Sequence, residues 1–448
     1  MLAGCLPLWL TSGTLVPRKA ARKARHRSTE STRRALPAAA IYYSRWIMQV
    51  SVGYCDIPDT ALAGRQAASE AYQKAGRNDP CDLVLLFATA SHNADALRAA
   101  VAAVVGEKAS IVGGGAVGAM SGDRFGYAGD QVGLACFWLE GARFDLAIEG
   151  GLEGSEADVG EKLGKKLAAL GVQPSSPVLL FYDAVDKSDA GMRMIMATYL
   201  LPALEKGLGF LPNLNGAGLQ GDFLLTPTGQ YLGDHIADHH AIALAFSGDV
   251  QIDATIMHGC RPATGYYTVT RADAQTILEI NGKPALEFMD SILGPQVRPE
   301  DYPFFLIFGV NKGERWGEFD EKSYASRLCL AIDKERGGIV MFEPDMVAGT
   351  EFQIMYRSLE FGYMPPRIEQ VFENLNGRKP VFALYINCAG RAAGFAGMDL
   401  EDALVVQKTV NGRAPLLGIY TGVEIASVGG EPRGLDWTGV FCLFSVSA

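Results

Sequence analysis

Strand and helix signals alternate along the first half of the chain. The strand-like stretch QVSVGYC follows Met48, and a helical pattern covers residues 61–75. A continuous apolar run, LVLLFAT, occupies residues 83–89, and Asn93 is placed as an N-cap before ADALRAAVAAVV. This order of signals predicts an α/β domain.

The same order returns about 95 residues further along the chain. The apolar strand PVLLFYDA (177–184) is followed by a helical stretch that contains Pro202. The glycine-rich run LPNLNGAGLQGD and the strand AIALAFSG complete the second copy. We therefore predict that residues 48–252 form an N-terminal domain with an internal strand–helix–strand–hairpin pseudo-repeat.

The pattern changes from about residue 253. The alternating stretches YYTVT and TILEI accompany an Asn281–Gly282 hairpin signal, and PALEFMDSILG predicts a helix. Two more helical stretches flank the strand PVFALYINC, and LLGIYTGVEIASV and VFCLFSVS predict the last strands. A C-terminal domain over residues 253–448 is expected, with a mixed sheet flanked by helices, so the whole chain is predicted to be a two-domain, mixed α/β protein.

The stretch SIVGGGAVG (110–118) contains G-x-G-x-x-G, the spacing of a dinucleotide-binding turn. That motif requires its third glycine to open a helix, but the loop-like AMSGDRFGYAGDQ follows Gly118. The second copy, LNGAGLQGD, lacks the spacing altogether. We therefore interpret these glycines, Gly114 and Gly115 included, as turn positions where the chain passes close to itself or to a ligand.

Charge is spread unevenly over the 448 residues. Residues 1–47 hold nine Lys and Arg against one acid, Glu30, and the rest of the chain has a net charge of −18. A body this acidic repels phosphate backbones, so nucleic acid is not an expected partner. We interpret the basic segment as sequence upstream of the true start codon, which we place at Met48, and a transit peptide is the alternative. In either case the segment is expected to lie outside the fold.

Eight scattered cysteines without a C-x-x-C pair argue against zinc and for a reducing compartment. No uninterrupted apolar window of 18 or more residues occurs, so no membrane span is predicted. We expect a cytoplasmic protein.

The C-terminal half resembles a known family. The segment HGCRP…YTVTRADAQTILEINGKPALEFMDSILG is similar to the opening of the FIST C domain, and INCAGR (386–391) and PLLGIYTGVEI (415–425) are similar to its closing motifs. The final motif reads TGVEI where the family more often has an aromatic residue and a glycine before the glutamate. Residues 50–250 are similar to the FIST N domain in pattern and order.

The resemblance implies a stand-alone sensory protein of intracellular signal transduction. It implies a small-molecule ligand, for which an amino acid is one candidate, and a separately encoded signalling kinase or cyclase as partner, because no output domain is recognisable. Some members of the family bind haem and respond to nitric oxide, so a haem-based sensor is one alternative. A Cys-dependent hydrolase or transferase and an interaction scaffold are the others.

Two residues of the INCAGR motif carry candidate chemistry. Arg391 could clamp a ligand carboxylate bidentately, or could form a structural ion pair with an acid such as Glu401 or Glu424. Cys388 could be a thiolate nucleophile if Arg391 lowered its pKa, although a buried, inert thiol is the favoured interpretation.

Other candidates lie outside that motif. Arg261, on the loop between the predicted domains, could bind the ligand or form a salt bridge at the junction. Tyr420 and Glu424 alternate along one predicted strand, so both are expected on one face, lining a pocket or packing in the core.

Histidines supply the remaining candidates. His92 or His258 could be an axial ligand if haem is bound, although no C-x-x-C-H motif for covalent attachment occurs. His235 and His239 have a helical metal-ligand spacing in a segment that does not look helical, and no metal site or firm cofactor is predicted. No hydrolase elbow, P-loop or H-E-x-x-H motif occurs, which favours a sensor over an enzyme.

Overall fold

Three copies of one strand–helix unit account for most of the structure, a computed structural model that describes residues 48–188, 191–227 and 229–448. Each copy runs strand, helix, strand, helix, strand, hairpin, strand. The predicted mixed α/β class and the N-terminal pseudo-repeat are confirmed, and a third copy that the sequence analysis did not predict follows them. The predictions for residues 1–47 lie outside the described residues.

The elements of the copies correspond one to one. The first copy comprises β1 (Gln49–Cys55), α1 (Thr60–Ala75), β2 (Leu83–Ala88), α2 (Ala94–Val105), β3 (Ser110–Gly115), β4 (Gly118–Met120), β5 (Phe125–Tyr127) and β6 (Val132–Trp138). The second comprises β7 (Ala142–Gly150), α3 (Glu156–Ala169), β8 (Pro177–Asp183), α4 (Ala197–Leu208), β11 (Asn213–Leu219), β12 (Gln230–Gly233), β13 (Ile236–Ala237) and β14 (His240–Gly248), with the extra hairpin strands β9 (Val185–Ser188) and β10 (Gly191–Met194) after β8. The third comprises β15 (Gln251–Met257), α6 (Met364–Glu373), β24 (Lys379–Cys388), α8 (Asp402–Val410), β25 (Leu416–Thr421), β26 (Val423–Val428), β27 (Glu431–Leu435) and β28 (Gly439–Val446).

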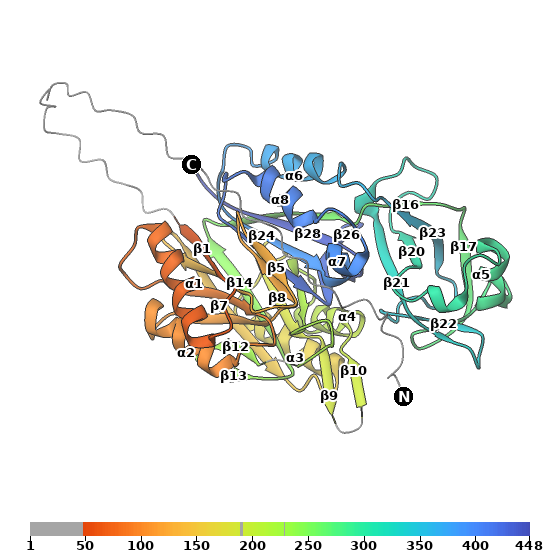
Figure 1. Cartoon of the computed structure of the whole chain (residues 1–448), viewed down its shortest axis with the longest axis horizontal. Helices are drawn as coiled ribbons and strands as arrows, with labels where there is room; N and C mark the ends of the chain where they lie inside the picture. The colour runs from red at the N-terminus through yellow and green to blue at the C-terminus, as the bar shows by residue number, and fades with distance from the viewer. Residues whose placement is uncertain (1–47, 189–190, 228) are drawn as a thin grey trace, which may run out of the picture. The chain divides into compact units, whose positions relative to one another are not determined.

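Each copy forms four neighbouring strands of a sheet in the same spatial order. The orders are β1-β6-β2-β3, β7-β14-β8-β11 and β15-β28-β24-β25. The two strands joined by the second helix are parallel in every copy, and the last strand lies antiparallel between the first and the second. Helix pairs such as α1 and α2 cover one face of each sheet (Figure 1). Because both faces are covered, the central strands are continuous apolar runs such as LVLLFA.

The hairpin of each copy is added to the sheet of another copy. Strand β4 pairs with β25, β12 pairs with β3, and β26 pairs with β11. Each of the three sheets built from the copies is thereby completed to six strands by a hairpin from another copy. The first copy gives its hairpin to the third, the third to the second, and the second to the first. Backbone hydrogen bonds therefore connect all three copies.

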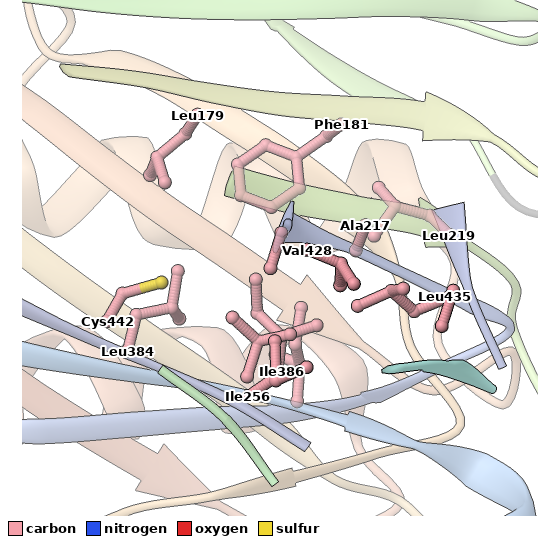
Figure 2. Close-up of a cluster of buried hydrophobic side chains, with 14 of the residues drawn as sticks. Leu179, Phe181, Ala217, Leu219, Ile256, Leu384, Ile386, Val428, Leu435 and Cys442 are labelled. Atoms are coloured by element: carbon pink, nitrogen blue, oxygen red, sulfur yellow. The ribbon is translucent and has the colours of Figure 1, made fainter. Parts of the chain in front are cut away.

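The faces of the sheets away from the helices share one apolar core. Figure 2 shows Leu179 and Phe181 of β8, Ile386 of β24 and Leu435 of β27 within one cluster of buried apolar side chains. The rings of Phe87 and Phe181, from the first and second copies, lie with their centroids 5.3 Å apart in an edge-on arrangement. Burial of each such side chain contributes about 1.5–3 kcal/mol, so this core is a main source of stability.

Glycines mark the close contacts within the sheets. The prediction that Gly113–Gly115 lie in a turn is wrong, because they end strand β3. A Cβ atom on Gly113 would overlap the carbonyl oxygen of Leu86 on β2, and one on the equivalent Gly216 of β11 would overlap that of Leu180 on β8. The strands leave no room for a side chain there. No helix follows Gly118, as predicted, because the hairpin β4–β5 begins at that residue.

A further sheet, of eight strands, is inserted between β15 and α6 of the third copy. Its β20 pairs with both β21 and β23, so six of its strands close on themselves. The predicted Asn281–Gly282 turn is confirmed, with φ of +49° and +75° at the two residues. The insert contains β16 (Cys260–Pro262), β17 (Tyr267–Asp273), β18 (Thr276–Ile280), β19 (Lys283–Pro284), α5 (Ala285–Leu293), β20 (Ile307–Asn311), β21 (Tyr324–Asp333), β22 (Gly338–Met341) and β23 (Glu351–Arg357).

The third copy begins at β15, which starts at Gln251, close to the predicted domain boundary at residue 253; that boundary stays a prediction. In the part of the chain that the structure describes, no helix has both the length and the apolar character to cross a membrane.

Candidate functional site

Four of the predicted site residues gather at one end of the third copy. Strands β24 and β25 are parallel, and Cys388 and Tyr420 lie at or next to their carboxyl ends. Arg391 follows β24 in a short 3₁₀ turn (Ala389–Arg391), and Glu424 lies in β26, just after β25. In open α/β sheets, ligands bind outside the carboxyl ends of parallel strands, so this end is the candidate site.

Arg391 is only 3% exposed, and protein groups engage all three nitrogens of its guanidinium. Its Nη2 lies 3.0 Å from Oδ2 of Asp402, which is fully buried. The further acceptors of its N–H groups are the Asn387 Oδ1, the Tyr363 hydroxyl and the backbone carbonyls of His258 and Trp437. The acid that pairs with Arg391 is therefore Asp402, and neither Glu401 nor Glu424. We call Arg391, Asp402, Asn387 and Tyr363 the Arg391 network.

Glu401 connects this network to Tyr420. The Tyr420 hydroxyl donates a hydrogen bond to Glu401 Oε1 at 2.9 Å, and the Ala393 N–H donates one to Oε2 at 2.8 Å. Burial, together with the neighbouring Asp402, raises the pKa of Glu401 to about 7. An acid that changes charge near neutral pH thus lies at the carboxyl end of β25.

Segments of the first copy reach the same place. The Tyr127 hydroxyl on β5 accepts a hydrogen bond from the Gly394 N–H at 2.9 Å. The side-chain amide of Gln407 on α8 donates to the carbonyls of Ser121 and Arg124 at 2.8 and 3.0 Å. The exchanged hairpin β4–β5 therefore links the N-terminal part of the chain to the loops around Arg391.

Tyr420 and Glu424 do not share a face, contrary to the prediction. The predicted single strand is interrupted at Gly422, and β25 and β26 belong to different sheets. Glu424 lies opposite Ala217 of β11, so its side chain is directed to the shared apolar core, whereas Tyr420 packs on the helix-covered face. The cause is the hairpin exchange, which the strand pattern does not reveal.

Cys388 lies on the core-facing side of β24, like Ile386, and is buried. Burial, and after it the carboxyl of Glu424, raises the pKa of its thiol well above the ordinary value. Since the thiolate is the reactive form, this environment suppresses nucleophilic chemistry. All the described cysteines are free and buried.

Glu424 is itself enclosed. Its Oε2 accepts a hydrogen bond from the Thr438 N–H at 3.2 Å, and its Oε1 lies 3.3 Å from the Thr421 hydroxyl. Burial raises the pKa of Glu424 well above its ordinary value, and the nearby Asp436 raises it further. Both effects favour the protonated, neutral form of the carboxyl.

The second copy supports this protonation state and supplies a test. Gln230 on β12 occupies the position that Glu424 occupies on β26. Each directly precedes the residue that pairs with the equivalent glycine of the neighbouring strand: Tyr231 with Gly113, and Ile425 with Gly216. The Gln230 Oε1 accepts from the His240 N–H at 2.8 Å, the equivalent of the bond to Glu424. A neutral amide thus does in one copy what the carboxyl does in the other.

We expect Glu424→Gln to keep the free energy of unfolding within about 1 kcal/mol of the parent at pH 7, because the amide can accept the same hydrogen bond. Glu424→Ala is the matched control and should cost about 1–3 kcal/mol, since it leaves the Thr438 N–H buried without a partner. Urea unfolding at pH 7 measures both. A Gln variant as unstable as the Ala variant would show that Glu424 is ionised.

The remaining predicted ligand residues lie elsewhere. Arg261 is exposed on β16, with its guanidinium 5.1 Å from the ring centroid of Phe319. Gly114 and Gly115 end β3, and a Cβ on Gly114 would contact Leu219 of β11. The structure does not bring these three residues to the Arg391 network.

Both histidines considered as haem ligands have their ring nitrogens in protein hydrogen bonds. The nitrogens of His92 lie 3.1 Å from the Thr60 hydroxyl and 2.9 Å from the Asp130 carbonyl. The ring nitrogens of His258 lie 2.9 Å from the backbone nitrogen of Cys260 and 3.2 Å from the carbonyl oxygen of Glu321. Burial lowers the pKa of His258. An iron ion would have to replace one of these bonds.

Two further features bear on cofactors. A hollow of about 520 Å³ opens beside His92, between residues 90–95 and 236–238. The segment of His235 and His239 is not helical, as expected, because β13 lies between them and His239 has a φ of +56°. Within residues 48–188, 191–227 and 229–448, no three His, Cys, Asp or Glu side chains are arranged to hold a metal ion.

The sequence analysis missed three buried acids around this end. Asp402 begins α8, where the helix N-terminus favours a carboxylate, so the run DLEDAL was a usable signal. Glu343 accepts hydrogen bonds from the Ala197 and Thr198 N–H groups and so caps α4 from a distant segment. Asp436 accepts from the Leu328 N–H, and burial raises its pKa to about 7. No local pattern marks the last two.

Comparisons with known proteins agree with the motifs. The model of the FIST N domain matches residues 82–283, and that of the FIST C domain matches residues 285–427. Among curated proteins, the chain is 27% identical to the uncharacterized protein Rv0628c of Mycobacterium tuberculosis over 196 residues, 43% of this chain and 50% of that protein. It is 26% identical to the uncharacterized protein Mb0898c of Mycobacterium bovis over 193 residues, 42% of this chain and 49% of that protein. The aligned part of the chain spans about half the length of these curated relatives.

Among solved structures, a cyanuric acid hydrolase from A. caulinodans aligns at 14% sequence identity with a TM-score of 0.26, over 45% of this chain and 71% of that one. A similarity of this size supports no conclusion about fold or function.

Proposed function

We propose that this chain, which belongs to the family of proteins that combine a FIST N domain with a FIST C domain, is a sensory protein that binds a small metabolite. FIST domains are associated with sensory signalling. The proposal includes a cytoplasmic location and a separately encoded kinase or cyclase as the partner that receives the signal. An amino acid is one candidate ligand, and the predicted site residues remain the first to test.

The observation that carries the proposal is the connection between the two FIST domains at the Arg391 network. Tyr127 and Arg124 of the N-terminal part contact the segment around Gly394 and α8 in the C-terminal part. Loops at the carboxyl ends of parallel strands are the usual place for a ligand in α/β proteins. A molecule bound beside these loops would therefore act on both domains at once, as a sensor requires.

The chemistry of the site favours binding over catalysis. Burial keeps the thiol of Cys388 in its neutral form, and Arg391 is paired with Asp402. A hydrolase using Cys388 would need an ionised, accessible thiol. The hydrogen bonds of the Arg391 network suit a structural frame around the carboxyl ends of β24 and β25.

The test is a melting-temperature screen of the purified protein against amino acids, aliphatic acids, aromatic acids and their neutral analogues, after an absorbance spectrum. A true ligand at 100 times its Kd should stabilise the protein by about 2.7 kcal/mol. A Soret band would replace this proposal with the haem-based sensor. Rapid alkylation of Cys388 in the native protein would favour the Cys-dependent enzyme. No colour and no melting shift would favour an interaction scaffold.

A further inference from the structure

Arg357 is a cation without an anionic partner in the described part of the chain. It ends β23, and its Cζ atom lies 4.4 Å from the ring centroids of both Phe305 and Trp437. Its guanidinium makes no hydrogen bond or ion pair with any described residue, although the side chain is half-buried. Burial lowers its pKa, and the nearby positive charge of Arg391 lowers it further. A guanidinium so placed normally has a carboxylate beside it.

The exposed ring of Phe305 lies against this arginine, and further exposed rings continue from its chain neighbour Phe304. Phe305 is 68% exposed, Phe395 41% and Phe304 37%. Phe395 stacks on Phe223 with centroids 5.2 Å apart, and the Phe304 centroid lies 5.8 Å from that of Phe395. We call Arg357 and the rings of Phe223, Phe304, Phe305, Phe395 and Trp437 the aromatic–arginine patch. Grouped apolar side chains at a surface mark binding sites, because their exposure is unfavourable.

The patch is assembled from segments that are far apart in the sequence. Phe223 follows β11, Phe395 belongs to the short helix α7 (Ala393–Ala396) after β24, and Phe304 precedes β20. Two of these segments leave the carboxyl ends of parallel strands, where α/β proteins place their ligands. The carbonyl of Trp437 accepts a hydrogen bond from Arg391 Nη1 at 3.4 Å, which ties the patch to the Arg391 network.

We propose that the aromatic–arginine patch binds a small planar aromatic anion, with its carboxylate on Arg357 and its ring against Phe304, Phe305 and Phe395. A guanidinium offers two parallel N–H donors that match a carboxylate, and aromatic rings pack edge-on or offset against a flat ligand. The half-buried charge gains the counterion that the protein does not supply. This inference rests on the proposed function, since it names the ligand class and the place of binding.

The experiment compares 2-naphthoate, its neutral amide 2-naphthamide and the aliphatic anion hexanoate by isothermal titration calorimetry. We expect the naphthoate to bind about tenfold more tightly than the amide, since a bond to a charged group contributes about 1.5–3 kcal/mol. It should also exceed hexanoate, which lacks the ring. Equal affinities for acid and amide would overturn the role of Arg357.

Variants locate the site. Arg357→Gln should weaken naphthoate about tenfold or more, and Phe305→Ala, at an exposed ring that can be removed without unfolding, should weaken it as well. Arg315→Gln is the matched control: Arg315 also lies over two rings, those of Tyr266 and Trp316, both at 5.0 Å, but it is paired with Glu351 at 2.8 Å. Naphthoate binding that is unchanged in both patch variants would overturn the inference.

The outcomes separate this inference from the proposed function. If an aliphatic or amino-acid ligand stabilises the protein and Arg357→Gln leaves its affinity unchanged, while naphthoate does not bind, only the patch is overturned. If no compound of any class binds, both fall. Far-UV circular dichroism and melting temperature establish that each variant is folded.

Discussion

Arg391→Ala is expected to lower the free energy of unfolding by about 3–5 kcal/mol, the cost of removing one partner of a buried ion pair. Asp402, fully buried, would lose the guanidinium that pairs with it. The Asn387, His258 and Trp437 acceptors would lose a donor as well. Urea unfolding at pH 7 measures the loss, which is a large part of the stability of an ordinary domain.

Two further variants separate the charge from the packing. Asp402→Asn in the Arg391→Ala background should recover part of the loss, because it removes the unpaired charge, and the pair should be strongly non-additive. Arg298→Ala is the control, since Arg298 forms its ion pair with Asp301 at the surface and its loss should have no measurable effect. An Arg391 variant as stable as the parent would show that the pair is not closed in solution and would leave Arg391 available for a ligand carboxylate.

The strand and helix signals were sufficient to predict the elements of the first two copies, because short loops connect consecutive elements there. The N-cap Asn93, the buried run at Leu83–Ala88 and the strand Pro177–Asp183 were all found from local pattern. The third copy was missed because the closed sheet β16–β23 separates β15 from α6. An insertion of that length removes the fixed spacing by which a repeat is recognised.

The site was harder to predict, because its contacts are decided by pairing between copies. Hydrophobic alternation across Tyr420 and Glu424 is the same whether one strand continues or two strands join different sheets at Gly422. The acid that pairs with Arg391 could not be predicted, because it depends on where α8 begins relative to β24. The observed start of α8 places Asp402, and not Glu401, at the guanidinium. The patch around Arg357 combines rings from four separate segments of the chain, and no local spacing links them.

The protein is expected to become less stable as the pH rises from 5 to 8, and Asp436 alone should account for on the order of 3 kcal/mol, the equivalent of roughly two pKa units between pH 5 and its folded pKa of about 7. Burial raises the pKa of Asp436 and of Glu401 to about 7, and that of Asp183 to about 6. The pKa values of Glu343 and Glu424 are raised as well. Each of these groups holds a proton in the folded state at a pH where the unfolded chain has lost it. Their stabilising contribution is therefore complete below the unfolded pKa, near 4, and is lost as the pH passes through the folded value.

Urea unfolding at pH 5, 6, 7 and 8 measures this slope, and Asp436→Asn tests its origin. Asparagine keeps the oxygen that accepts from the Leu328 N–H at 2.9 Å but cannot ionise, so its loss of stability between pH 6 and pH 8 should be smaller than that of the parent. Asp273→Asn, at an exposed carboxylate paired with Arg336, is the control and should leave the slope unchanged. A stability that rises with pH over this range would mean that the buried acids are ionised in the folded protein. Glu424 and Asp436 would then be charged in the folded state, and the nearby guanidinium groups of Arg391 and Arg327 would have to compensate them.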